Sequence, residues 1–589
     1  MPMHQYDYLF AIGTIFAALD AWNIGANDVA NSWATSVASQ SVTYLQAMVL
    51  ASIMEFAGAV GVGARVADTI RTKIVDTSLF AEVPELLMLG MVCAVVASSV
   101  YLTFATRIGM PVSTTHSILG GVIGMGVAAV GADGVQWVSP EGNINSGVVQ
   151  VFLAWIIAPG LSGAFAAILF LVTKYTVMVR KNPAIWALRV VPVYFGLTAC
   201  LLTMLLLWKG GGYKVTLTDP EIAGTIVGVG AAFALLIGVT LTPWMYRVVI
   251  REDWQLRWYH IPMGLLLLRR GEVPPPPADV DVGVKDYYEG RLTKEQLDAR
   301  NAAERGDVEV VGDSNPEKIK NADGSDAGSA ERPTPSPLAN ITKAPKKLVG
   351  PKPEGKWYQG HVLFWYFKWA LLHGIDQDVV NAQSTHNKLA NNLDEVHAHA
   401  QHFDNKTEYM YSFLQIMTAA TASFVHGAND IANAIGPYAS IFQIWNETPL
   451  PEDGKSEVPI WILVFGAAML VIGVWTYGYN IMRNLGNRLT LQSPSRGFSM
   501  ELGSAITVIL ATRLSANYLA ELPVSTTQCI TGATVGVGLC SGTWRTVNWR
   551  MVAWIYLGWI ITLPVTGIIS GCLMGIIINA PRWGMPTTN

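Results

Sequence analysis

The sequence predicts an all-α polytopic membrane protein, on the basis of its composition, its long apolar segments and an internal repeat. Charged residues make up 14% of the 589 residues, against roughly 25% in a typical soluble protein, and apolar residues make up 51%. Segments long enough to cross a hydrocarbon core of about 30 Å recur along the chain. They lie at 87–103, 148–172, 190–207, 222–241, 460–479 and 552–578.

The N-terminal segment is apolar from Tyr8 but carries neither a basic stretch nor a small-residue cleavage site, so a retained first transmembrane helix is expected. The net charge of -4 is small for a chain of this length and gives no indication of a nucleic-acid partner. All five cysteines lie in or beside apolar segments without metal-ligand spacing. We interpret them as packing residues: Cys93, Cys200, Cys529, Cys540 and Cys572.

A polar segment at 251–357 divides the membrane part into an N-terminal block, 1–250, and a C-terminal block, 358–589. Its prolines, charges and Gly/Ser-rich stretches cannot bury enough apolar surface to offset ordering entropy. We therefore predict a disordered loop with a short helix at 293–304. Basic clusters at both ends favour a cytoplasmic location and a regulatory role for this loop.

Two motifs occur twice and in the same order. GANDVAN at 25–31 recurs as GANDIAN at 427–433, and ATR followed by PVSTT, at 105–107 and 111–115, recurs at 511–513 and 523–527. Collinear matches of this kind indicate a duplicated transport unit. The sequence therefore predicts two homologous halves, about 5–172 and 408–578.

The first motif places a carboxylate between two amides within an apolar helix. A carboxylate at membrane depth costs a few kcal/mol, so it normally faces a cavity or a partner. Carboxylate and amide oxygens suit a small, hard cation. A polar clamp between helices is the alternative, but two symmetric copies favour a binding site. The residues are Asn27, Asp28 and Asn31, with Asn429, Asp430 and Asn433 in the second copy.

The second motif follows a helix-breaking proline with three hydroxyl residues and a short Gly-rich apolar stretch. This pattern predicts two re-entrant hairpins, each with its hydroxyls at the start of a half-helix. Free N–H groups and the helix dipole would make an anion site there. N-capping is the alternative, although a cap needs one hydroxyl. The residues are Ser113, Thr114 and Thr115, with Ser525, Thr526 and Thr527 in the second copy.

An oxyanion held by these hydroxyls would be repelled by the nearby carboxylates unless a cation intervened, which predicts cation coupling. Phosphate fits better than sulfate, since protonated phosphate can donate a hydrogen bond to a carboxylate. The choice between Na⁺ and H⁺ stays open at this point.

Two further acids lie near the motifs. Glu55 is surrounded by apolar and small residues, and alignment of the halves places Leu470 opposite it. Glu501 begins a predicted helix, where stabilisation of the N-terminus is an alternative to a transport role. No group of nucleophile, general base or metal ligands predicts an enzyme. We interpret His116, His373 and His426 as residues that pack helices together or that support the ligands of a site from behind. Repeats with broken helices favour a carrier over a channel.

Both duplicated motifs, together with LQSPSRGF at 491–498, closely resemble the inorganic phosphate transporter (PiT) family, and especially its fungal sodium/phosphate symporters. The resemblance implies about 12 transmembrane helices in two inverted repeats, two re-entrant hairpins, external termini and a cytosolic loop. It implies Na⁺-driven phosphate uptake across the plasma membrane without a cofactor.

The resemblance also assigns roles to the candidate residues. Asp28, Asp430 and the two hydroxyl clusters would hold phosphate, and the four asparagines, Glu55 and Glu501 would serve Na⁺. A proton-coupled phosphate carrier or a sulfate carrier of the same fold is the alternative, and a homodimer stays open. One departure is the second repeat's spacing from Arg513 to Pro523, which implies about six extra residues within 515–521.

Overall fold

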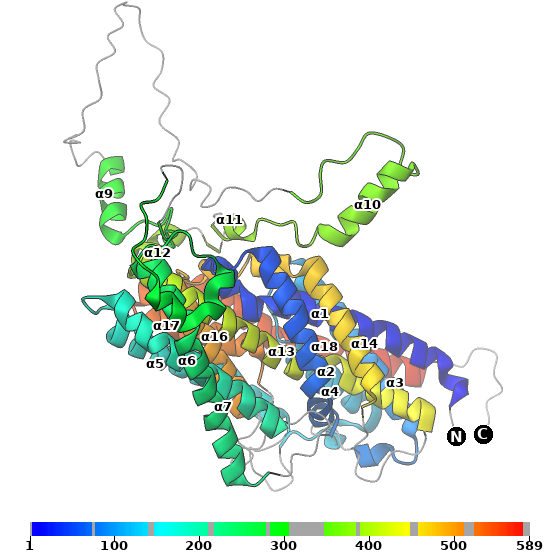
Figure 1. Cartoon of the computed structure of the whole chain (residues 1–589). Coiled ribbons are helices and arrows are strands. Elements are labelled where there is room, and N and C mark those ends of the chain that lie inside the picture. Colours follow the sequence, from blue (N-terminus) through cyan, green and yellow to red (C-terminus); the bar gives the residue numbers. More distant parts are fainter. Residues whose placement is uncertain are drawn as a thin grey trace, which may run out of the picture.

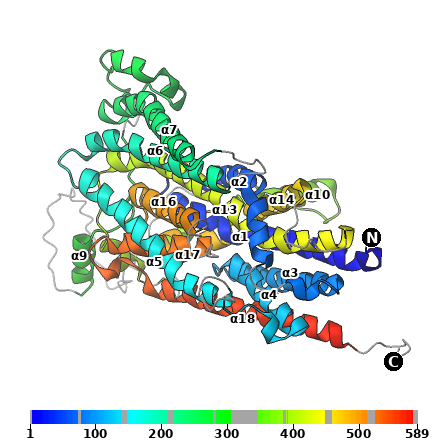
Figure 2. The same ribbon diagram turned by 90° about the horizontal axis from the view of Figure 1, so that it is seen from below.

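The computed structural model is a bundle of long helices (Figure 1). The start of the first helix and the end of the last lie at the same end of the bundle, where Tyr6, Tyr8 and Ile577 line one small cavity (Figures 1 and 2). The structure describes residues 3–72, 77–138, 147–209, 217–277, 283–305, 347–384, 389–390, 392–447, 458–511 and 524–580.

Eight helices in the described residues are long and apolar enough to cross a membrane, whereas the family resemblance implies about twelve. A shorter apolar helix occupies Thr114–Val130. The helices Thr114–Val130 and Thr526–Leu539 fall outside the set of eight because they have only 17 and 14 residues, whereas the polar residues of Asn405–Glu447 lower its hydropathy. The eight are His4–Ala38, Tyr44–Ala64, Pro84–Arg107, Val148–Met178, Pro183–Trp208, Asp219–Ile250, Ile460–Tyr477 and Trp549–Asn579.

The two predicted halves contain corresponding series of helices. The first half has α1 (Asp7–Ala38), α2 (Tyr44–Thr72), α3 (Pro84–Arg107), α4 (Thr114–Val130) and α5 (Val148–Thr173). The second has α13 (Asn405–Glu447), α14 (Ile460–Tyr477), α15 (Tyr479–Met482), α16 (Pro494–Ala511), α17 (Thr526–Leu539) and α18 (Trp549–Asn579). Between them lie α6 (Pro183–Lys209), α7 (Asp219–Val239), α8 (Leu241–Met245), the 3₁₀ segment η6 (Trp258–Arg269), α9 (Lys294–Arg305), α10 (Gly360–Leu372), α11 (Val379–Ser384) and α12 (Leu393–Ala398).

Each half packs its helices onto the other half in a reciprocal way. Helix α2 packs on α13 while α14 packs on α1, and α4 packs on α18 while α17 packs on α5. Aligned glycines make the closest approaches: a Cβ at Gly25 would lie 1.9 Å from the carbonyl oxygen of Leu470, and one at Gly427 would lie 2.2 Å from that of Glu55. Only glycine allows these backbones to approach so closely.

Helices α1 and α13, which carry the duplicated GAND motifs, run antiparallel to each other. At one end, the Met3 amide donates to the Trp445 carbonyl (2.8 Å). At the other end, the Ser39 hydroxyl donates to Gln415 Oε1 (2.7 Å). The two copies of the motif therefore meet near the middle of the bundle, within its largest apolar core cluster, which includes Ile24 and Leu470.

A turn between two helices precedes the first hydroxyl cluster. Helix α3 ends at Arg107, Gly109 turns the chain with a φ of 73°, and α4 begins after Ser113. Helix α17 begins after Ser525 in the same extended N-cap conformation. The hydroxyls therefore lie at helix starts, as predicted. The proposed extra residues within 515–521 lie outside the described residues.

Part of the predicted loop departs from the expected disorder. The short helix predicted at 293–304 is confirmed as α9, but the segment before it packs on the bundle: Tyr288 is buried and its hydroxyl donates to Glu408 Oε1 (2.8 Å). Burial lowers the pKa of the Arg291 guanidinium to about 10. This segment is ordered because it contains aromatic side chains. The burial of two tyrosines offsets the loss of conformational entropy, which the other, polar residues of the loop could not offset.

Candidate transport site

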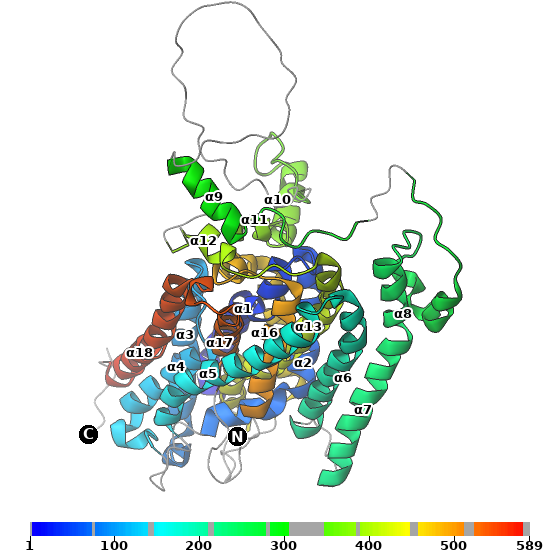
Figure 3. The ribbon, with the colours of Figure 1, turned by 90° about the vertical axis from the view of Figure 1, so that its left-hand side faces the viewer.

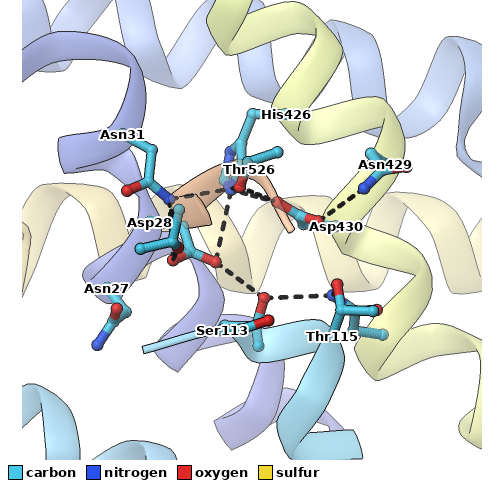
Figure 4. A network of polar contacts seen from close by, with 12 residues as sticks. Asn27, Asp28, Asn31, Ser113, Thr115, His426, Asn429, Asp430 and Thr526 are labelled. Carbon is cyan, nitrogen blue, oxygen red and sulfur yellow. Dashed lines mark hydrogen bonds and ion pairs between the residues drawn. The ribbon is translucent and has the colours of Figure 1, made fainter. Parts of the chain in front are cut away.

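The centre of the bundle contains two buried carboxylates from the duplicated motif. Asp28 on α1 and Asp430 on α13 are each 1% exposed. His426, one turn before Asp430, lies between them: one ligand atom from each of the three residues lies within 4.8 Å of the others (Figure 4). The antiparallel crossing of α1 and α13 therefore brings together charges that are about 400 positions apart in the sequence.

Each carboxylate accepts a hydrogen bond from the helix start of its own half. The Thr114 hydroxyl at the start of α4 donates to Asp28 Oδ2 (2.8 Å), and the Thr526 hydroxyl at the start of α17 donates to Asp430 Oδ2 (2.8 Å). The matching atoms and distances indicate that the two repeats build equivalent sites.

The amides of the motif connect the two halves. Asn31 on α1 donates to the Thr527 hydroxyl (2.9 Å), and Asn433 on α13 donates to the Thr115 hydroxyl (3.2 Å). Asn31 also donates to Asp28 Oδ1 (3.2 Å). The hydroxyl clusters are thus held by hydrogen bonds from both halves. A movement of one half relative to the other would change these hydrogen bonds.

His426 contacts the buried carboxylates directly, which goes beyond the packing or supporting role that we expected from the sequence. Its Nε2 lies 3.0 Å from Asp430 Oδ2 and 3.7 Å from Asp28 Oδ2, and its Nδ1 lies 3.2 Å from Glu55 Oε1. Within the described residues neither nitrogen makes a hydrogen bond of good geometry, so each contact is an ion pair when the imidazole is protonated. The signal was present in the sequence, because residues i and i+4 share one helix face and His426 precedes Asp430 by four.

Glu55 lies in the α2–α13 contact, fully buried. Its Oε1 accepts a hydrogen bond from Ser423 (3.3 Å), while Oε2 has no partner within the described part of the chain. Leu470 makes the equivalent close approach to Gly25 in the α1–α14 contact. The acid is therefore not duplicated, as the sequence alignment predicted.

Glu501 is enclosed by hydrogen-bond donors. It is the eighth residue of α16, which starts at Pro494, so stabilisation of a helix N-terminus does not explain it. Its Oε1 accepts from Thr35 and Ser36 (both 2.6 Å) and from Gln415 Nε2 (3.2 Å), and its Oε2 accepts from Thr418 (2.6 Å). No spacing in the sequence predicted these four donors, which come from α1 and α13.

A polar route leads from Glu501 towards the surface. Gln415 accepts hydrogen bonds from Ser39 (2.7 Å) and Ser41 (2.6 Å). Ser41 lines two adjoining cavities of about 470 and 720 Å³ at the turn between α1 and α2, together with Lys285. Polar groups therefore extend from the Glu501 carboxylate to an open cavity at the turn between α1 and α2.

The remaining predicted residues occupy supporting positions. Asn27 donates to Thr106 (3.0 Å) and accepts from the Val112 amide (3.2 Å), which holds the α3–α4 turn, and Figure 4 shows it apart from the contacts joining the other residues. Ser113 caps α4 by accepting from the His116 amide (3.2 Å). Asn429 donates to Asp430 Oδ1 (2.9 Å). Ser525 is buried at the α17 N-cap without a side-chain cap bond.

This arrangement offers ligands both to an anion and to a cation. The starts of α4 and α17 gather hydroxyls and free N–H groups, which suit an oxyanion. The carboxylates of Asp28, Asp430, Glu55 and Glu501 supply hard oxygen ligands, which suit an alkali cation.

Known proteins resemble the chain along nearly its full length. The profile of the phosphate transporter family matches residues 24–570. The chain is 71% identical over 595 residues to the phosphate-repressible phosphate permease pho-4 of Neurospora crassa, covering 99% of this chain and 100% of that protein. It is 26% identical over 680 residues to sodium-dependent phosphate transporter 2 of Homo sapiens, covering 98% and 99% respectively.

A solved structure titled "The sodium-dependent phosphate transporter" shares the fold, with a TM-score of 0.62 at 24% identity, covering 98% of this chain and all of that chain. The family and these relatives are transporters, which agrees with the expectation that the chain is not an enzyme. Since the family profile covers most of its length, this chain belongs to the phosphate transporter family.

Proposed function

We propose that the protein imports inorganic phosphate in symport with Na⁺ by alternating access. The observation that carries this proposal is the pair of buried carboxylates, Asp28 and Asp430, each bonded to the hydroxyl that starts a short helix. An anion at those helix starts lies next to negative charge, so its binding requires a cation.

Phosphate would bind between the starts of α4 and α17. Thr114, Thr115, Thr526 and Thr527 supply hydroxyls, Ser113 and Ser525 set the helix starts, and the first turns supply backbone N–H groups. A protonated phosphate oxygen would donate to Asp28 or Asp430. Sulfate has no such proton at neutral pH, so sulfate transport is the less favoured alternative.

Sodium would bind at the oxygen-rich positions beside the phosphate. Asn31, Asn433 and Asn429 contact the central carboxylates or hydroxyls, and Asn27 would act indirectly by holding the α3–α4 turn. Glu55 and Glu501 would complete sodium sites away from the centre. Relatives named as sodium-dependent phosphate transporters support this choice of cation.

Alternating access requires two halves that can exchange roles across the membrane. The antiparallel course of α1 and α13 and the reciprocal packing of α2 and α14 support inverted repeats. In this scheme about twelve segments cross the plasma membrane, α3–α4 and α16–α17 form the re-entrant hairpins, the termini lie outside and the loop at 251–357 lies in the cytosol. A homodimer is compatible with it.

Proton coupling is a second candidate because of His426. An imidazole placed 3.0 Å from one carboxylate and 3.2 Å from another can carry a proton with the phosphate in place of Na⁺. No comparable titratable group occupies the aligned position in the first half, where residue 24 is isoleucine.

Uptake of radiolabelled phosphate into proteoliposomes, with Na⁺ and pH gradients imposed separately, tests the proposal. We expect an inward Na⁺ gradient at equal pH to drive the accumulation of phosphate. When labelled sulfate replaces labelled phosphate, we expect no accumulation. Accumulation that follows only the pH gradient would replace Na⁺ symport with the proton-coupled alternative.

A further inference from the structure

Helix α10 (Gly360–Leu372) presents an apolar face that no described part of the chain covers. Phe364 is 67% exposed, Phe367 62% and Leu371 49%. Their spacing of three and four residues places them on one side of the helix. Such a surface on a helix at the end of a membrane protein calls for a specific neighbour.

The opposite side of α10 is fixed to the protein. Val362 is fully buried, Trp365 Nε1 donates to the Gly350 carbonyl (2.8 Å), and Lys352 Nζ donates to the Tyr366 hydroxyl (2.8 Å). The exposed face is therefore held in one orientation by the preceding segment.

Contacts at its C-terminus place α10 at the boundary of the membrane. Trp475 Nε1, near the end of the apolar span Ile460–Tyr477, donates to the Leu371 carbonyl (2.9 Å). Tyr44, where the span Tyr44–Ala64 begins, donates to the Gly374 carbonyl (3.1 Å). Figures 1 and 3 show α10 beside this end of the bundle. With 13 residues, the helix is about 20 Å long and too short to cross a core of about 30 Å.

The residues around this face match a lipid headgroup region. Residues 347–372 contain four lysines and one acid, Glu354, together with three tryptophans and two tyrosines. Tryptophan and tyrosine prefer the membrane interface, and lysines there are attracted to anionic lipids. A second copy of the chain would bring the same lysines together, which their mutual repulsion opposes.

We propose that α10 lies in the interfacial layer of the bilayer and binds anionic lipid. Phe364, Phe367 and Leu371 enter the boundary between headgroups and acyl chains, and Lys352, Lys356 and Lys368 contact lipid phosphates. The helix thereby anchors the segment that joins the long loop to the second half of the protein. This contact is independent of the transported substrate.

Fluorescent labels on single introduced cysteines test the proposal in proteoliposomes. The label is placed at Phe364→Cys, at Ala299→Cys on the exposed surface of α9 as the water-facing control, and at Ile568→Cys on α18, which is 65% exposed, as the lipid-facing control. All variants carry Cys572→Ser to remove the exposed native thiol. Quenching by lipids with brominated acyl chains is compared with quenching by aqueous iodide.

We expect the Phe364 label to resemble the Ile568 label, with several-fold more quenching by brominated lipid than the Ala299 label. If iodide quenches the label at Phe364→Cys as much as the label at Ala299→Cys, the proposal is wrong. Energy transfer between labels at Phe364→Cys that persists when the protein is diluted with lipid would also overturn it, because it would show that a second copy covers the face. Lys352→Gln, Lys356→Gln and Lys368→Gln together should at least halve the gain in quenching when phosphatidylglycerol replaces phosphatidylcholine. An unchanged gain would refute the binding of anionic lipid.

Discussion

His426 Nδ1 lies 3.2 Å from Glu55 Oε1, and neither residue has a polar counterpart in the other half of the protein. Alignment of the repeats pairs His426 with Ile24 and Glu55 with Leu470, both of which are fully buried in the core. The packing at these positions is symmetric, but the charge is not. A single histidine–carboxylate contact therefore distinguishes the α2–α13 interface from the α1–α14 interface.

The first prediction follows from this asymmetry. His426→Ile should strongly destabilise the protein, by about 3–5 kcal/mol, because it leaves the Glu55 carboxylate buried without its partner. Glu55→Leu with His426→Ile reproduces the pair found in the other half. The double variant should therefore be more stable than the sum of the two single changes indicates, when unfolding is followed in detergent.

Phosphate uptake distinguishes a functional pair from a structural one. We expect the double variant to fold but to lose Na⁺-driven uptake. Wild-type uptake by the double variant would show that the pair only supports packing, and additive losses of stability would show that the two side chains do not interact.

The second prediction concerns the glycines at the crossing of the halves. Gly25→Ala or Gly427→Ala places a methyl group 1.9 or 2.2 Å from a backbone oxygen, so the helices must separate. Either variant should lose most of its folded yield. Gly61→Ala on α2, which has open space around it, is the matched control and should fold normally. Normal thermal stability in Gly427→Ala would contradict the close contact between the halves.

From the duplicated motifs, the sequence predicted most of the residues that the fold brings together in the candidate site. Collinear repeats identified Asp28, Asp430 and the hydroxyl clusters, and the alignment showed that Glu55 is not duplicated. His426 was missed because a search for symmetry gives no weight to a residue present in one half only. The donors around Glu501 were missed because α1, α13 and α16 meet there through tertiary packing, which leaves no spacing signal.

The fold was predicted less completely than the site. Hydropathy identifies helices whose surfaces face lipid, whereas α13 contains Glu408, Gln415 and Asp430, which neighbouring helices shield. The loop was predicted from the average composition of 251–357, in which a single residue such as Tyr288 has little weight. The ordered part of the loop was therefore not expected. In both cases contacts between distant segments outweighed the local pattern.

The third prediction tests the ordered part of the loop. Tyr288→Phe removes the hydroxyl that donates to Glu408 and accepts from the Phe403 amide (3.2 Å). A buried polar group left without a partner costs about 1–3 kcal/mol. We expect a lower unfolding temperature with an unchanged phosphate KM. Tyr259→Phe, at a position that is 59% exposed, is the control and should have no effect. Equal unfolding temperatures for the two variants would show that the segment is not docked.

The fourth prediction concerns the helix-start hydroxyls. Thr114→Ala and Thr526→Ala each remove the hydroxyl that donates to a central carboxylate and that would face phosphate. Phosphate binding should weaken at least tenfold, with a smaller loss of thermal stability. Among the described residues, the Thr534 hydroxyl bonds only within α17, to the Ile530 carbonyl (2.7 Å), so Thr534→Ala should leave binding unchanged. Unaltered phosphate affinity in Thr114→Ala and Thr526→Ala would make these residues helix-start supports only.

The last prediction is that Asp28 and Asp430 couple the cation to phosphate. They occupy the same place in the two repeats, each is buried, and each accepts one hydroxyl from a helix start. A carboxylate at membrane depth is costly, and a neighbouring anion raises that cost. Asp28→Asn or Asp430→Asn keeps the shape of the side chain and removes its charge, so phosphate no longer needs a cation to offset the repulsion. Either variant should lose Na⁺-driven accumulation while retaining phosphate binding that depends less on Na⁺. Phosphate binding and uptake by the purified variants across a series of Na⁺ concentrations provide the measurement, and wild-type uptake with unchanged Na⁺ dependence would contradict a coupling role.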